Sequence, residues 1–173
     1  MTLYRSVAAA GSGPAAAPHT FGVSLGHREL SEADHWILSL TPRPEWATTH
    51  LVAEPYRHVA ISLTASEVID SADGMGVAAA AALSGKFGRA VIFPGAAALV
   101  GVLTVADVLA RSAIDKVEIL GSGAALPEDQ INTHNFVRPQ FRDGELVLTV
   151  MPGAGGVLVP FETANPTPCC ESH

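Results

Sequence analysis

The sequence predicts an α/β fold with a mainly parallel central sheet flanked by helices and extended by a C-terminal β-hairpin. The prediction depends on three short apolar runs at residues 58–63, 89–93 and 116–120, each followed by small or hydroxylated residues. The segments between the runs are long enough for helices. Alternation of strand, loop and helix is typical of a parallel sheet, so we expect residues 19–162 to form one α/β domain.

One helix is expected before the first apolar run. Apolar residues recur at three- and four-residue spacing between Leu30 and Leu40, which is typical of an amphipathic helix. Ser31 is a possible N-cap, and two prolines just after Leu40 would end the helix. Residues 45–56 are expected to form a connector that contains a short strand at 49–53.

Two further helices are expected to follow the first two apolar runs. Residues 64–67 have a capping-box pattern, and Thr104 to Asp107 has the pattern of a second helix start. Residues 145–150 and 156–161 are rich in β-branched and other apolar residues, with glycines between them. These two segments predict the C-terminal hairpin.

The two ends of the chain show no pattern of regular structure. Residues 1–18 are rich in Ala, Gly, Ser and Pro without periodicity, and we expect a flexible arm. Residues 163–173 contain prolines and end in Cys-Cys-Glu-Ser-His, and we expect an extended tail.

The amino-acid composition limits the classes of partner that the protein is expected to bind. Charged residues make up 16% of the 173, which favours burial of some surface in a homo-oligomer. The net charge is −7 and there is no basic run, which argues against nucleic acid. The uncharged segment 90–106 is too short to span a bilayer, so no membrane partner is expected. The only cysteines are adjacent, which disfavours a disulfide and favours a cytoplasmic protein.

A small anionic ligand is the leading functional hypothesis. In an open parallel sheet, ligands bind outside the carboxyl ends of the strands. The residues expected there are small or hydroxylated: Thr64, Ser66, Gly95, Gly121, Ser122 and Gly123. Caps and tight turns are the structural alternative for the same residues, and neither the chemistry nor a cofactor can be named.

Residues 99–109, Leu-Val-Gly-Val-Leu-Thr-Val-Ala-Asp-Val-Leu, contain the pattern Gly-x-Leu-Thr-x-x-Asp. This segment resembles the closing segment of a CBS module. The resemblance implies that Thr104 and Asp107 contact the phosphate and ribose of an adenosine nucleotide. It covers about eleven residues, CBS modules normally occur in pairs, and no second copy is found. Capping of a helix is the alternative role for both side chains.

Two other groups of side chains could carry chemistry. Cys169, Cys170 and His173 offer thiolate and imidazole ligands for Zn²⁺ or Cu(I), or else form an exposed tail with reactive thiols. His134 is a candidate general base within a polar connector, with a surface turn as the alternative. A second function class also stays open: a non-catalytic subunit or scaffold that engages a partner protein through its low-charge surface and Pro-Cys-Cys tail.

Overall fold

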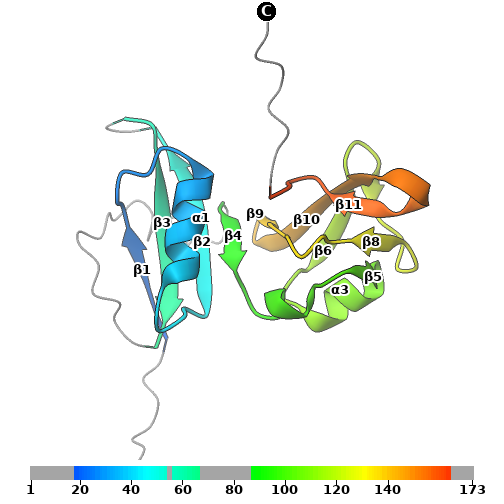
Figure 1. Cartoon of the computed structure of the whole chain (residues 1–173), viewed down its shortest axis with the longest axis horizontal. Coiled ribbons are helices and arrows are strands. Elements are labelled where there is room, and N and C mark those ends of the chain that lie inside the picture. Colours follow the sequence, from blue (N-terminus) through cyan, green and yellow to red (C-terminus); the bar gives the residue numbers. More distant parts are fainter. Residues whose placement is uncertain (1–17, 54–55, 67–86, 165–173) are drawn as a thin grey trace, which may run out of the picture.

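The computed structural model describes residues 18–53, 56–66 and 87–164, and this part of the chain is mostly β (Figure 1). It forms an 11-stranded mixed sheet in which most pairs are antiparallel, and it contains two short α-helices. Only two strand pairs in these ranges, β6 with β10 and β8 with β11, are parallel. The predicted α/β fold with a mainly parallel sheet is therefore wrong.

The N-terminal part is an antiparallel sheet with the order β1-β3-β2-β4 and one helix on one face (Figure 1). Its elements are β1 (His19–Val23), α1 (Leu30–Ser39), β2 (Trp46–Val52), β3 (His58–Ala65) and β4 (Arg89–Ile92). Ala33 and Ile37 of α1 pack on Val23, Ala47 and Ile61 in a core of their own.

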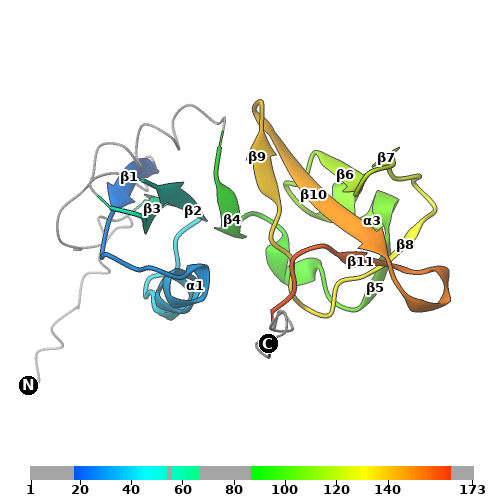
Figure 2. The ribbon, with the colours of Figure 1, turned by 90° about the horizontal axis from the view of Figure 1, so that it is seen from above.

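The C-terminal part has a second core between its strands and helix α3 (Figure 2). Its elements are η1 (Ala96–Ala98), β5 (Val102–Thr104), α3 (Val105–Arg111), β6 (Lys116–Ile119), β7 (Gly123–Ala124), β8 (Gln130–Asn132), β9 (Gln140–Arg142), β10 (Glu145–Pro152), η2 (Ala154–Gly156) and β11 (Leu158–Pro160). Val105 and Val108 of α3 belong to the same buried cluster as Leu146, Leu148 and Val150 of β10. Because β10 and β11 pair antiparallel, the predicted C-terminal hairpin is confirmed.

The two parts meet at a short junction between β4 and β9. Arg89 pairs with Gln140, Ala90 donates a backbone hydrogen bond to Pro139 (2.8 Å), and Phe141 donates one to Gly88 (2.8 Å). Pairing ends there, while β2 continues beyond the start of β4 as far as Val52. The junction therefore leaves a recess that is lined by side chains from both parts of the sheet.

The sequence predicts the positions of the strands and helices more accurately than it predicts the directions of the strands. The three apolar runs are strands, and the helices expected near residues 30–40 and 104–112 are confirmed. Residues 46–52, expected to be mostly connector, form the strand β2, which lies between β3 and β4 and is antiparallel to both. The strands β3 and β4 therefore run in the same direction without being neighbours. The helix expected after Thr64 falls largely outside the described residues, and Thr64 itself still belongs to β3.

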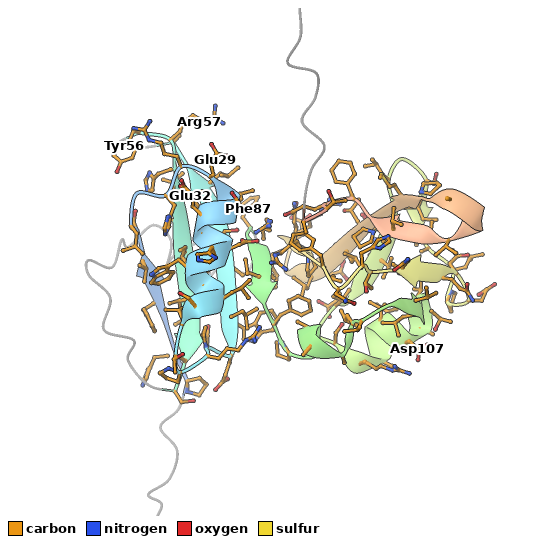
Figure 3. The ribbon with its side chains drawn as sticks, viewed as in Figure 1. Glu29, Glu32, Tyr56, Arg57, Phe87 and Asp107 are labelled. Carbon is orange, nitrogen blue, oxygen red and sulfur yellow. The ribbon has the colours of Figure 1, made fainter. Side chains whose placement is uncertain are left out.

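Side chains bond to the backbone at the start of both helices, and Figure 3 labels Glu29, Glu32 and Asp107 there. The helix α1 has Glu29 as its N-cap instead of the predicted Ser31, and the Glu32 carboxylate accepts hydrogen bonds from the backbone of Arg28 (3.1 Å) and Glu29 (3.4 Å). At α3, Thr104 accepts a hydrogen bond from the backbone N–H of Asp107 (3.1 Å). Neither helix is long and apolar enough to cross a bilayer.

Candidate functional site

A buried polar cluster lies on the face of the β2–β3 pair that is turned away from α1. Thr48 and His50 alternate with Ala47, which packs in the core beneath α1, and they therefore point to the opposite face. Ser62 of β3 lies directly opposite Thr48 in the pairing register. The exposed fractions are 6% for Thr48, 7% for His50 and 2% for Ser62. We call these three residues the polar cluster.

Hydrogen bonds join all three side chains of the polar cluster. His50 Nε2 lies 2.7 Å from Ser62 Oγ and 3.2 Å from Thr48 Oγ1, and the two hydroxyl groups also bond to each other. We assign Ser62 as the donor to Nε2 and Thr48 as the donor to Ser62, which places the imidazole proton on Nδ1. Burial lowers the pKa of His50 below its ordinary value, so the ring is neutral at pH 7.

The second ring nitrogen of His50 is unsatisfied. Nδ1 is buried and has no hydrogen-bond partner in the described ranges. Gly88 faces it: a Cβ at this position would lie 3.3 Å from Nδ1 and 2.8 Å from Cε1, and the φ of Gly88 is +139°. Glycine at position 88 therefore lets the backbone approach the ring more closely than any other residue could. Leaving a buried polar atom without a partner costs about 1–3 kcal/mol, which a hydrogen bond from Nδ1 to a water or a ligand would recover.

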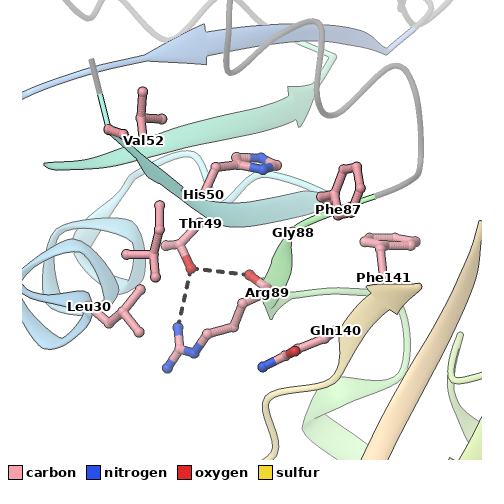
Figure 4. Close-up of a pocket in the computed structure, with 11 residues that line it drawn as sticks. Leu30, Thr49, His50, Val52, Phe87, Gly88, Arg89, Gln140 and Phe141 are labelled. Atoms are coloured by element: carbon pink, nitrogen blue, oxygen red, sulfur yellow. Dashed lines mark hydrogen bonds between the residues drawn. The ribbon is translucent and has the colours of Figure 1, made fainter. Parts of the chain in front are cut away.

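His50 borders a cavity of about 530 Å³ at the start of β4 (Figure 4). Phe87 lies on the same side of β2 as His50, whereas Leu30 lies on the side of α1 (Figure 4). The remaining lining comes from both parts of the sheet: Thr49, Leu51, Val52, Ala53, Gly88, Arg89, Gln140 and Phe141.

A second cavity of about 260 Å³ lies over the hydroxyl groups of the polar cluster. Its polar lining consists of Thr20, Thr48, Ser62 and Thr64, and its apolar lining of Trp46, Phe87 and Phe141. Phe87 and Phe141 line both cavities, so the two spaces are adjacent. The rings of Trp46 and Phe141 are 5.8 Å apart and tilted by 38°, which makes one aromatic wall. We call the two spaces together the junction cavity.

The only charged group in the described lining of the junction cavity is already neutralised. Arg89 binds Asp34 with both terminal nitrogens, at 2.6 and 2.9 Å, and binds Glu162 through Nε at 2.7 and 2.8 Å. Burial alone would lower the pKa of Arg89, but the hydrogen bonds to Asp34 and Glu162 raise it above its ordinary value. Its charge is therefore committed to two carboxylates, and the cavity presents aromatic rings, hydroxyl groups and a neutral imidazole.

No protein-family model, curated protein or solved structure matches this chain. The chemistry of the site therefore follows from its own geometry.

The residues predicted to bind an anionic ligand occupy both parts of the sheet. Thr64 of β3 bonds to Thr20 (2.8 Å) and lines the junction cavity, and Ser66 donates to Glu45 (2.9 Å). Gly95 begins η1, where any side chain would overlap the backbone of Arg111 and Ser112. Gly121 and Ser122 lie in the exposed turn between β6 and β7, and Gly123 begins β7, in the other part of the sheet from Thr64. The structure therefore does not gather these residues around Thr64, and ligand binding by them stays a prediction.

The remaining predicted residues have simpler surroundings. His134 is exposed in a turn with φ +48°, and its backbone N–H donates to Asn132 (3.1 Å). Thr104 and Asp107 bond to each other at the start of α3, which is the capping role left open for them. Across residues 18–53, 56–66 and 87–164 there is no group of three His, Cys, Asp or Glu that could hold a metal. Cys169, Cys170 and His173 lie outside the described residues.

The sequence interpretation missed all three members of the polar cluster. His50 fell in an expected connector, and Ser62 lay inside an apolar run. One signal was available: polar residues alternate at Thr48 and His50, and again at Ser62 and Thr64. Period-two polarity on two adjacent strands predicts one polar face, although only the register shows which residues meet.

Proposed function

We propose that the protein binds a small, uncharged ligand in the junction cavity, with His50 as its anchor. The observation that carries this proposal is that His50 lines the 530 Å³ space and that its buried Nδ1 has no partner among the described residues. A ligand acceptor such as a carbonyl oxygen would satisfy the Nδ1–H group. Such a bond recovers the free energy that the unpartnered atom costs the protein alone.

The lining determines the class of ligand. Phe87 and Phe141 border both spaces, and Trp46 lies beside Phe141, so a flat apolar portion of a ligand would find aromatic contacts. Arg89 is occupied by Asp34 and Glu162, and burial keeps His50 neutral. An anion entering this space would lose its hydration without gaining a free cation in return. These contacts favour a planar, neutral molecule that carries a hydrogen-bond acceptor.

Fragment binding followed by NMR tests this proposal with matched probes. Benzamide is flat, neutral and carries a carbonyl acceptor, whereas benzoate has the same shape and a negative charge. We expect benzamide to shift the resonances of Thr48, His50, Gly88 and Gln140, with a Kd near 1 mM, which is about −4 kcal/mol. Benzoate should bind at least about tenfold more weakly, a difference of about 1.4 kcal/mol.

Two variants connect the binding to the site. Phe141→Ala removes part of the aromatic wall and should weaken benzamide binding, whereas Phe161→Ala removes an exposed ring that lines neither space and should leave it unchanged. Equal shifts with benzoate, or shifts confined to residues away from the junction, would refute the proposal.

A further inference from the structure

We propose that Ser62 is a nucleophile activated by His50, and that the protein transfers the acyl group of a small neutral ester to water. This activity rests on the proposed binding of a neutral ligand in the junction cavity. Ser62 Oγ lies 2.7 Å from His50 Nε2, which is within reach for direct proton transfer. The geometry points to this pair because the hydroxyl group and its base are already in contact, with Ser62 lining the 260 Å³ space and His50 the adjacent 530 Å³ space.

The environment of His50 suits a general base. The ring is neutral, and with its proton on Nδ1 the Nε2 lone pair is directed at Ser62. Thr48 bonds to Ser62 Oγ and lies 3.2 Å from the same nitrogen, so both hydroxyl groups are held at the ring. The protein supplies no acceptor for Nδ1–H in its described part, and a second acceptor group of the bound substrate, separate from the reacting ester carbonyl, would take that place.

The second space provides room for the reacting acyl group. Ser62 lines the 260 Å³ cavity together with the hydroxyl groups of Thr20 and Thr64, which lie 2.8 Å from each other. Their mutual bond uses one of the two hydroxyl hydrogens, and the other hydroxyl is a donor available to an oxyanion in the same space. Trp46 and Phe141 form the apolar wall beside them.

The reaction proceeds in two balanced steps. The Ser62 oxygen attacks the ester carbonyl carbon, its proton passes to His50 Nε2, and the carbon–oxygen bond to the leaving alcohol breaks as that alcohol takes the proton. Water then attacks the acyl carbon and gives a proton to His50; the bond from the acyl carbon to Ser62 Oγ breaks, the acid leaves, and His50 returns the proton to the Ser62 oxygen. One ester and one water give one acid and one alcohol.

A fluorophosphonate probe tests the nucleophile in the native full-length chain. Attack by Ser62 forms a phosphorus–oxygen bond and breaks the phosphorus–fluorine bond, and fluoride leaves while the proton goes to His50. We expect one label per chain, located on Ser62 by peptide mass spectrometry. Excess benzamide should slow labelling, because both molecules occupy the junction cavity. This readout needs no variant and so does not depend on the folding of one.

Variants then separate the role of Ser62 as nucleophile from that of His50 as base. Ser62→Ala should abolish the label, and His50→Gln should slow labelling at least about 10²-fold through loss of the base. Ser112→Ala removes a serine that bonds to the Val108 carbonyl (2.7 Å) and should label at the native rate. Absence of label on Ser62 while benzamide still binds would refute the nucleophile and leave the binding site standing. Failure of benzamide to bind would refute the proposed function itself.

Discussion

The charge cluster that joins the two parts of the sheet should be costly to break. Asp34 of α1 binds Arg89 of β4 at 2.6 and 2.9 Å and Arg138, which precedes β9, at 3.0 Å. Side-chain exposure is 11% for Asp34, 8% for Arg89 and 10% for Arg138. Burial lowers the pKa of Arg138 despite the attraction of Asp34, so this buried charge is stabilised by the carboxylate and would be costly without it. We therefore choose Asp34→Asn, which removes the charge and keeps the shape.

The expected loss of stability follows from the partners that the two arginines keep in the variant. In Asp34→Asn, Arg89 keeps Glu162, whereas Arg138 keeps only the Val137 carbonyl (3.1 Å) and the face of the Phe136 ring (4.2 Å). Removing one partner of a buried ion pair costs about 3–5 kcal/mol. For a chain of this size each kcal/mol lowers Tm by about 2–4 °C, which gives a fall of about 6–20 °C.

Urea denaturation followed by tryptophan fluorescence measures this loss, since one of the two tryptophans, Trp36, lies on α1 beside the N-terminal core. Glu118→Gln is the matched control, because Glu118 binds Lys116 (2.6 Å) and Arg142 (3.1 Å) at the surface. Exposed pairs contribute about 0–1 kcal/mol, so the control should lose no more than that. Equal losses for the two variants would show that the cluster does not hold the two parts together.

Three further predictions concern the turn beside His50, a helix cap and pH. Gly88→Ala should destabilise the protein by about 1–3 kcal/mol in the same urea assay, because its methyl group would lie 2.8 Å from the His50 ring. Gly101→Ala is the control for backbone strain, since Gly101 has φ +78° and open space around it. An equal loss of stability in the two variants would exclude the clash with His50. Thr104→Ala should cost about 1 kcal/mol through loss of the α3 cap, and Thr104→Ser should restore most of it; a loss in both would contradict the capping role. Because the pKa of His50 is lowered in the folded state, the unfolded chain binds a proton first as pH falls through about 6.5. The free energy of unfolding should therefore fall more steeply with acid in the native chain than in His50→Gln. Parallel curves for the two proteins would be evidence against a buried neutral ring.

The sequence predicts the strongly apolar elements and fails where polar residues form the sheet. The runs ending at Leu63 and Phe93 are buried strands because both faces pack, and residues of this type identify strands without fixing their direction. Strand β2 carries Thr48, Thr49 and His50 at its centre, so its composition resembles a connector, although it separates β3 from β4. Missing one polar strand therefore turned an antiparallel sheet into a predicted parallel one.

The candidate site could not be predicted from the sequence, for the same reason. His50 and Ser62 are twelve residues apart, and their contact exists only because β2 and β3 pair in one register. The predicted ligand residues were chosen for one shared edge at the carboxyl ends of parallel strands, but β3 and β4 are separated by β2, and β6 lies in the other part of the sheet. Thr64 is the one member of that set that also lines the junction cavity, since it shares the face of Ser62.

The state of the His50 imidazole tests the account most directly. Two-dimensional ¹⁵N NMR of the histidine side chains distinguishes the two neutral tautomers from the charged ring, and His50→Gln assigns the signal. We predict a neutral ring with its proton on Nδ1 at pH 7, still neutral below the ordinary histidine pKa of about 6.5. Added benzamide should shift the Nδ1 resonance. A ring protonated on Nε2, or one that titrates at its ordinary pKa, would contradict both the anchor for a neutral ligand and the activation of Ser62.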